Sequence, residues 1–354
     1  MDFSLGEDRQ MLVDTLGRFL AGNFDWKTRE TVIETAEGWS RPVWAQLAEL
    51  GVIGALFDEA SGGFGGSAFD IGVVFAEVGK ALAVGPFLGT LLAGRALAAT
   101  GETALLEQAI AGEVTLSAAL DSDAAQGVAD GEGWALTGTQ PVVPFAASAD
   151  RIVVAARTGE GPSLFLIEKG APGIEIRDYP LIDGGAAGEL MLDGAAATLL
   201  GQAGEAGAII EEAVAAGLVA LCWEAVAIMD SLKVQTLEYL RTRKQFGVAI
   251  GKFQALQHRM ADLFADLAQM RSAVEGGLQA IDSGFGVAQA ATVAKAEANR
   301  VLHLISNQGI QLHGGIGMTD EYDVGFYLKR ARVLESSWGS SSYLRDRFAR
   351  LSKY

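Results

Sequence analysis

The segment EYLRTRKQFGVAIGKFQALQHRMADL, residues 238–263, carries the densest chemical signal in the chain. A helical pattern runs up to Leu240, and Phe246-Gly247 is expected to break the helix. A short turn then leads to Phe253-Gln254, where a second helix is expected to begin. The cationic and amide side chains that crowd this corner are Arg241, Arg243, Lys244 and Gln245.

A positive corner calls for an explanation in a chain whose net charge is -17. Arginine presents a rigid fork of donors to phosphate, so an anionic ligand such as a pyrophosphate is one interpretation. The alternative is a solvent-exposed helix end, where cations complement the negative end of the helix dipole. The residue spacing alone leaves both interpretations open.

Length and composition bound the class of protein. A chain of 354 residues has room for two or three domains of roughly 150 residues each. Hydrophobic residues make up 50% of it, which is enough for large cores and for apolar contacts between subunits. A pI near 4.6 argues against general nucleic-acid binding, because that function requires a basic surface. Three histidines and one cysteine are poor material for a zinc site, so no metal is expected.

We expect a cytoplasmic protein with no membrane association. No run of roughly 18 apolar residues is free of charge, as a transmembrane helix would require. The N-terminal residues MDFSLGEDRQML are acidic and do not resemble a signal peptide.

Hydrophobic periodicity divides the chain into three expected domains. Residues 1–110 carry apolar residues at three- and four-residue spacing, which predicts helices. Residues 111–203 carry short apolar runs about ten residues apart with turn signals between them, which predicts a β-barrel or sandwich. Residues 204–354 show long apolar stripes that predict an antiparallel helical bundle. The glycine-rich loop SGGFGGSAFD, residues 61–70, is expected either near a cleft or as a plain surface loop.

A second glycine-marked corner lies in QGIQLHGGIGMTDE, residues 308–321. A helix is expected to end at Gly314-Gly315, where backbone amides can approach a ligand closely, and Gln311 and His313 flank the pair. Glycine ends many helices, so this motif is weak evidence by itself. Together with the cationic corner in the same bundle it becomes more specific.

RTRKQFGVAIGKFQALQHRMADL, followed at this distance by QLHGGIGMTDEY, resembles the acyl-CoA dehydrogenase family. The phrases DGEGWALTGTQ and ASADRIVVAARTGEGPSLFLIEKGAPGI resemble that family's middle domain. The resemblance implies an α+β multidomain fold, with an N-terminal helical domain, a middle β-barrel and a C-terminal four-helix bundle. It also implies a tetramer that binds FAD and oxidises an acyl-CoA to its α,β-enoyl product. An electron-transferring flavoprotein would then accept the electrons.

The resemblance also implies which residues hold the cofactor. Those matching the family's grip on the ADP half of FAD, across a subunit interface, are Arg243, Phe246 and Gln254. Those matching the segment that contacts the FAD of a neighbouring subunit are Gln311, Leu312, His313, Gly314 and Gly315.

Several positions depart from the family pattern. The middle-domain loop that usually reaches the flavin ring reads LDSDAAQGVAD, residues 120–130, without its Thr-Glu-Pro. The segment that usually lies against the ring is Pro141-Val142-Val143-Pro144-Phe145. The chain thus lacks most of the family's ring contacts while it keeps the motifs that reach a neighbour's FAD.

The family's catalytic base is missing from both of its usual positions. Trp338 stands where most members place a glutamate, and Gly217 stands at the position that a minority use. Glu224 lies one heptad after Gly217 in an apolar run, and is the one catalytic candidate, because a buried carboxylate often marks function. The alternative for Glu224 is a structural pair with a neighbouring arginine. Glu335 faces nearly the same way as Trp338, but its spacing does not match the base.

AVAIMDSLKVQTLEYLRTRKQFG and YLKRARVLESSWGSSSYLRDRFARL resemble the small subunits of two-gene acyl-CoA dehydrogenases. That group includes pimeloyl-CoA dehydrogenase small-subunit-like proteins and the α2β2 enzymes of steroid degradation. Three hypotheses follow: a subunit of an active α2β2 enzyme with a larger partner, a non-catalytic structural or regulatory subunit, or a homotetramer that binds FAD through substituted contacts. Small residues at Ala215, Ala216 and Gly217 were also expected to leave room for a bulky acyl group.

Overall fold

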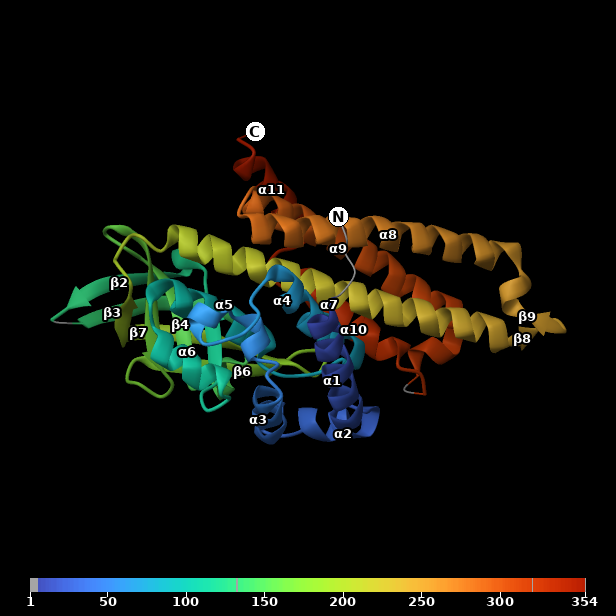
Figure 1. The fold of residues 1–354 in the computed structure, drawn as a ribbon, viewed down its shortest axis with the longest axis horizontal. Helices are drawn as coiled ribbons and strands as arrows, with labels where there is room; N and C mark the ends of the chain where they lie inside the picture. Colours follow the sequence, from blue (N-terminus) through green and yellow to red (C-terminus); the bar gives the residue numbers. More distant parts are fainter. Residues whose placement is uncertain (1–5, 132, 320, 354) are drawn as a thin grey trace. The chain divides into compact units, whose positions relative to one another are not determined.

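The computed structural model describes residues 6–131, 133–319 and 321–353 (Figure 1). The chain divides into two compact units. The first comprises the residues up to Val74 together with Val84–Gly217, and the second comprises Phe75–Ala83 and the residues from Leu218 onward. The expected division into three domains at residues 110 and 203 stays a prediction.

Helices open the first unit, as the apolar spacing predicts. They are α1 (Glu7–Asn23), α2 (Trp26–Ile33), α3 (Arg41–Glu49), α4 (Ala68–Ala81), α5 (Phe87–Thr100) and α6 (Thr103–Ile110). Pro42 lies in the first turn of α3, where its missing N–H has no partner to lose, and Ser40 caps the helix by accepting from the Val43 N–H. α4 continues past Val74 into the second unit.

The glycine-rich loop is packed tightly against its own backbone. A Cβ at Gly63 would lie 2.2 Å from the Phe57 carbonyl oxygen, and one at Gly65 would lie 2.5 Å from the Ala55 carbonyl oxygen. Its glycines therefore serve close chain packing, which favours the plain-loop interpretation over a ligand cleft.

The middle of the chain forms a closed sheet. The strands are β1 (Leu116–Ala119), β2 (Ala125–Asp130), β3 (Gly133–Pro144), β4 (Arg151–Thr158), β5 (Gly161–Glu168), β6 (Ile174–Pro180) and β7 (Ala186–Leu200). Strands β4, β2, β3, β7 and β5 pair in a circuit that β4–β5 pairing closes, while β1 adds to β4 and β6 adds to β7. The predicted barrel is confirmed, and its core includes Val154, Phe165 and Leu190, each fully buried.

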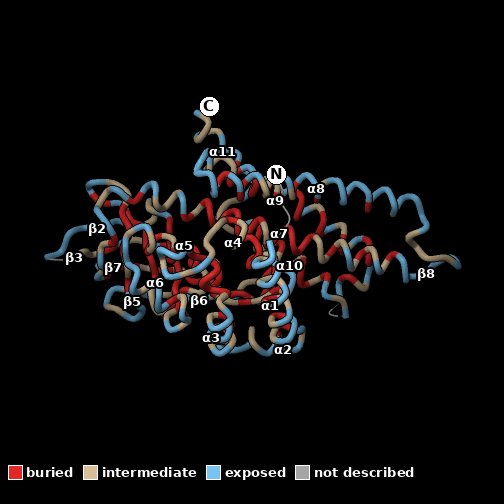
Figure 2. The backbone as a smooth tube through the Cα atoms, viewed as in Figure 1, coloured by how far each residue is buried: buried red, intermediate tan, exposed pale blue. Residues whose placement is uncertain are grey.

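The second unit is a helical bundle built from α7 (Gly207–Thr242), α8 (Gln254–Ser283), α9 (Val287–His313), α10 (Val324–Ser336) and α11 (Ser341–Leu351). α8 packs antiparallel to α9, and α10 and α11 both contact α9 (Figure 1). By length and composition α7 is apolar enough to cross a membrane, but 83% of its most apolar window is buried, as in the core helix of a bundle (Figure 2).

Candidate functional site

The cationic segment forms a small hairpin between α7 and α8, which we call the hairpin corner (residues 243–254). α7 ends at Thr242, and strands β8 (Lys244–Gln245) and β9 (Val248–Ala249) pair antiparallel. The predicted helix break at Phe246-Gly247 is instead the tip of this hairpin. Phe246 (φ 52°) and Gly247 (φ 77°) both adopt left-handed backbone, as a two-residue hairpin turn requires. The second helix begins at Gln254, as predicted.

The hairpin corner presents a cation and aromatic rings to solvent. Phe246 is 92% exposed and stands edge-on to Phe253, with ring centroids 6.2 Å apart. Arg243 is exposed, and within the described residues its guanidinium makes no ion pair or hydrogen bond. Gln254 is exposed as well. Left-handed backbone destabilises a non-glycine residue by roughly 1–2 kcal/mol. Phe246 therefore lowers the stability of the folded chain while its apolar ring is exposed to water.

The second corner lies at the end of α9. Gly314 (φ 67°) ends the helix, and a Cβ at Gly314 or Gly315 would have no atom within 4 Å. Gln311 and both glycines are exposed, whereas the side chains of Leu312 and His313 are buried. Only Gln311, Gly314 and Gly315 can contact a ligand from solvent directly. His313 can affect ligand binding only through the side chains that it packs against.

His313 joins the two corners. Its ring stacks on Tyr239 of α7, with centroids 4.6 Å apart, and meets Tyr322 edge-on. Tyr239 accepts through its carbonyl oxygen from the Arg243 N–H at 2.8 Å, so the stack leads directly into the hairpin corner. Burial lowers the pKa of His313, and its Nδ1 lies 2.8 Å from the Gly309 carbonyl oxygen. A neutral ring that donates from Nδ1 fits this geometry.

Glu224 is 2% exposed and forms an ion pair between α7 and α10. Arg330 donates through Nε to Oε1 at 2.6 Å and through Nη2 to Oε2 at 2.9 Å. α4 covers the pair, because a Cβ at Gly79 would lie 2.9 Å from Glu224 Cγ. This is the structural pair named above as the alternative to a base. A bidentate arginine occupies both carboxylate oxygens that a base would need free.

The two remaining base positions hold no carboxylate. Gly217 packs against α5, where a Cβ would lie 2.7 Å from Leu92 Cδ2. The expected room for a bulky acyl group at this glycine is therefore wrong, because Leu92 fills it. Trp338 lies half-buried between α10 and α11 with φ 57°, and an indole cannot accept a proton from carbon as a carboxylate can. Glu335 pairs with Arg332, Nη1 to Oε1 at 2.5 Å, and with His303.

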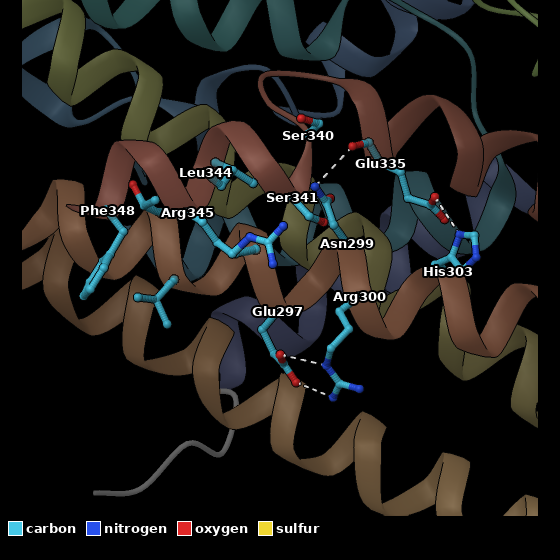
Figure 3. Close-up of a pocket in the computed structure, with 13 residues that line it drawn as sticks. Glu297, Asn299, Arg300, His303, Glu335, Ser340, Ser341, Leu344, Arg345 and Phe348 are labelled. Carbon is cyan, nitrogen blue, oxygen red and sulfur yellow. Dashed lines mark hydrogen bonds and ion pairs between the residues drawn. The ribbon is translucent and has the colours of Figure 1, made fainter. Parts of the chain in front are cut away.

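An open pocket of about 820 Å³ lies beside this turn, between α9, the end of α10 and α11 (Figure 3). Apolar side chains such as Val293, Leu344 and Phe348 line it. Two ion-paired carboxylates mark its polar side, Glu297 with Arg300 and Glu335 with His303. The sequence carries no signal for this pocket, because its lining comes from three helices at unrelated spacing.

The chain's residues fit the tail of FAD better than its ring. The exposed Arg243, Phe246 and Gln254 suit a diphosphate and an adenine. In the barrel, Pro141 and Pro144 have no N–H to donate to a flavin ring. The Pro141 carbonyl oxygen accepts from the Tyr179 hydroxyl at 2.9 Å. The predicted cofactor contacts stay predictions, and the geometry brings their two groups together through the Tyr239–His313 stack.

Comparison with known proteins places these observations in a family context. The family model for the acyl-CoA dehydrogenase N-terminal domain matches residues 6–112, and that for the C-terminal domain matches residues 197–352. The chain is 31% identical to acyl-CoA dehydrogenase IpdE2 of Mycobacterium tuberculosis over 335 residues, 93% of this chain and 94% of that protein.

Two solved structures share the fold over nearly their full length. A chain of the ChsE4-ChsE5 complex from Mycobacterium tuberculosis superposes with a TM-score of 0.92 at 25% identity, covering 100% of this chain and 99% of that one. A chain of a Tcur3481-Tcur3483 steroid ACAD variant superposes with a TM-score of 0.92 at 28% identity, covering 99% of each.

Proposed function

The chain belongs to the acyl-CoA dehydrogenase family, whose members depend on FAD, and on this premise we propose that it is one subunit of a heteromeric acyl-CoA dehydrogenase. In the proposed α2β2 enzyme a larger subunit seats the flavin ring and supplies the catalytic base. This chain then completes the site by holding the cofactor's tail. An acyl-CoA is the substrate, and an electron-transferring flavoprotein is the proposed acceptor.

One observation carries the proposal: the chain keeps a ligand-ready hairpin corner but no free base. The Arg243 guanidinium is exposed and makes no ion pair or hydrogen bond among the described residues, and Phe246 is 92% exposed with an edge-on contact to Phe253. By contrast, Trp338 and Gly217 hold no carboxylate, and Glu224 is tied to Arg330. A site divided between two subunits accounts both for the exposed hairpin corner and for the absence of a free base. The ChsE4-ChsE5 complex, one chain of which shares this fold, supports such an arrangement.

Within that site each residue has a physical task. Arg243 binds the diphosphate through charge-assisted hydrogen bonds, and Phe246 packs against the adenine. Gln254 orients the same half of the cofactor from the first turn of α8. Gly314 and Gly315 leave their backbone open to a close approach. When bound, FAD supplies the hydride acceptor for oxidation of the acyl-CoA at its α and β carbons.

The test is to co-express the chain with the acyl-CoA dehydrogenase encoded beside it and assay the purified complex. We expect flavin absorbance and turnover of at least one acyl-CoA, with neither from this chain alone. A stable complex without flavin and without activity toward any acyl-CoA would overturn the proposal.

A non-catalytic structural or regulatory subunit is the second candidate, and the Glu224–Arg330 pair favours it. Flavin retention by the complex after Arg243→Ala in this chain separates the two candidates, because only a subunit that holds the cofactor should then lose flavin. A Glu224→Gln variant in the complex tests Glu224 itself. Unchanged turnover would remove Glu224 from the chemistry, whereas loss of turnover with the complex still folded and flavin still bound would make it the base. Stoichiometric flavin in the chain purified alone would instead support a homotetramer.

A further inference from the structure

A buried lysine lies behind the turn that carries Trp338. Lys295 of α9 is 2% exposed and, within the described residues, has no carboxylate at ion-pair distance. Its Nζ donates to Asn299 Oδ1 at 2.5 Å and to the Leu334 carbonyl oxygen at 2.8 Å. The second of these bonds crosses from α9 to the last turn of α10, where carbonyl groups lack helical partners.

Asn299 extends the same contact to both sides of the turn. Because its Oδ1 accepts from Lys295, its Nδ2 is free to donate to other acceptors. Nδ2 donates to the Glu335 carbonyl oxygen at 3.1 Å (Figure 3) and to the Gly339 carbonyl oxygen, also at 3.1 Å. Two side chains one helical turn apart on α9 thus hold three main-chain carbonyls. We call this set the α9 clamp: Lys295 and Asn299, bound to the carbonyls of Leu334, Glu335 and Gly339.

The segment inside the clamp has a strained shape. Trp338 adopts φ 57°, and Gly339 adopts φ 127°, where a Cβ would lie 2.7 Å from Tyr343 Cδ1. Left-handed backbone costs tryptophan roughly 1–2 kcal/mol, and such strain persists only where surrounding contacts impose it. The clamp bonds on either side of Trp338 are those contacts.

A contribution to the stability of the fold does not by itself explain why residue 295 is a lysine. Burial lowers the pKa of Lys295 to about 8, and the charge of Glu335 opposes this shift only in part, so at neutral pH the fold holds a buried cation that has no carboxylate at ion-pair distance among the described residues. Cys222 is not a counter-ion, because burial raises the pKa of its thiol to about 12. An apolar side chain of similar volume would avoid this desolvation cost. What the lysine provides and an apolar residue cannot is a donor to the end of α10.

We propose that Lys295 and Asn299 are positioning residues that fix the turn 337–339 in the shape in which it contributes Trp338 to the completed flavin site. The role of the turn in the flavin site rests on the proposed function. The α9 clamp itself rests only on the hydrogen bonds described above. Neither Lys295 nor Asn299 is among the residues assigned above to the cofactor. They act through three carbonyls on a segment that most family members use for their base.

The decisive variant is Asn299→Asp. The carboxylate still accepts from Lys295 and gives it a counter-ion, so the core stays filled and paired. It has no N–H to donate, so the carbonyls of Glu335 and Gly339 lose their partner. Ser306→Ala is the matched control, because Ser306 is a fully buried polar residue of α9 that bonds only its own helix, at the His303 carbonyl oxygen.

In the chain alone we expect Asn299→Asp to speed amide hydrogen exchange at 337–340 at least tenfold, with the rest of α9 and α10 unchanged. Ser306→Ala should leave that segment as in the wild type. Unchanged exchange at 337–340 in Asn299→Asp, or equal acceleration along both helices, overturns the clamp. Should Asn299→Asp not fold, Lys295→Met, which keeps both Asn299 donors, is measured instead and should accelerate the same segment.

In the flavin-loaded complex we expect Asn299→Asp to retain its flavin, because the hairpin corner is untouched, while turnover falls at least fivefold. Loss of turnover in equal proportion to loss of flavin would show a general structural defect and contradict the positioning role. A loosened turn with wild-type turnover would also overturn that role and leave the proposed function standing. If the wild-type complex binds no flavin, the proposed function is wrong, and so is the role of Trp338 in a flavin site. The hydrogen-exchange experiment then still tests whether the α9 clamp fixes the turn.

Discussion

The hairpin corner and the buried core of the helical bundle treat charged side chains in opposite ways. In the hairpin corner, Arg243 has no partner among the described residues and Phe246 is 92% exposed. In the core, Glu224 is 2% exposed with both oxygens bonded to Arg330, and Lys295 spends its donors on a side chain and a carbonyl. The Arg243 guanidinium remains available to bind a ligand, whereas the hydrogen bonds of Glu224 and Lys295 connect helices within the bundle. Under the proposed function, the hairpin corner is the cofactor-binding surface, and Gly217 and Glu224 serve packing in the scaffold behind it.

Breaking the buried ion pair from one side should give the largest effect. Glu224→Ala removes the carboxylate that Arg330 Nε and Nη2 bond, and the Arg330 side chain is 25% exposed, so we expect the free energy of unfolding to fall by about 2–4 kcal/mol, less than for a fully buried pair. Chemical denaturation measures it. The double variant Glu224→Leu with Arg330→Met should recover most of the loss, because two apolar residues leave no charge unpaired. A loss below about 1 kcal/mol in Glu224→Ala would show that the pair is not structural.

The pH dependence of stability tests the buried lysine. The pKa of Lys295 is lowered from 10.5 in the unfolded chain to about 8 in the fold. Between these values the unfolded chain binds the extra proton, so stability rises with pH, by at most about 1.4 kcal/mol per pH unit. The wild type should therefore gain stability relative to Lys295→Met as the pH rises from 8 to 10, measured by denaturation, whereas the raised pKa of Cys222 lowers the stability of both proteins at the upper end of that range. Cys222 and Glu335, the titratable groups that act on Lys295, are unchanged in both. Parallel curves would contradict the lowered pKa.

On the exposed side, Arg243→Ala should weaken the grip on FAD without unfolding the chain. Loss of one charge-assisted hydrogen bond costs about 1.5–3 kcal/mol, which is roughly a 10- to 150-fold weaker retention of flavin by the complex. Arg241→Ala is the matched control, because Arg241 is an exposed arginine at the end of α7, two residues earlier. Equal flavin retention in the two variants would count against the assignment of Arg243.

The smallest expected effect separates stability from binding. Phe246→Asn should raise the free energy of unfolding by about 1 kcal/mol, because Asn-Gly suits a turn with two left-handed residues. Little burial is lost, since the ring is 92% exposed. The same variant should bind flavin less well in the complex. A variant that is less stable than the wild type would show that the ring is packed in this chain and not reserved for a ligand.

Much of this fold follows from local sequence pattern. Amphipathic spacing and a proline in the first turn are local signals that predict a helix at Pro42–Leu50, where the structure has α3 at Arg41–Glu49. The start of α8 at Gln254 is predicted in the same way. The hairpin corner was predicted as a helix break, since its Phe-Gly turn does not match the Asn-Gly pattern of common hairpins. The closed order of the barrel strands depends on pairings between distant segments, and no local pattern encodes them.

The exposed residues of the site can be predicted from the sequence, whereas the contacts of the buried residues cannot. Arg243 and Gly314-Gly315 belong to contiguous motifs, so they can be found by reading along the chain. The partner of Glu224 lies 106 residues away on another helix, and Lys295 looks like an ordinary surface lysine in an alanine-rich helix. The packing of Leu92 onto Gly217 likewise joins α5 to α7 across more than a hundred residues.

The central claim is that this chain holds the tail of a cofactor seated on another subunit, and a flavin absorbance spectrum tests it most directly. The chain is purified alone and together with its co-expressed larger partner. We expect no flavin absorbance from the chain alone, bound flavin in the complex, and loss of that flavin when Arg243 of this chain alone is replaced by alanine. Stoichiometric flavin in the isolated chain, or a complex whose flavin is indifferent to Arg243→Ala, would contradict the account.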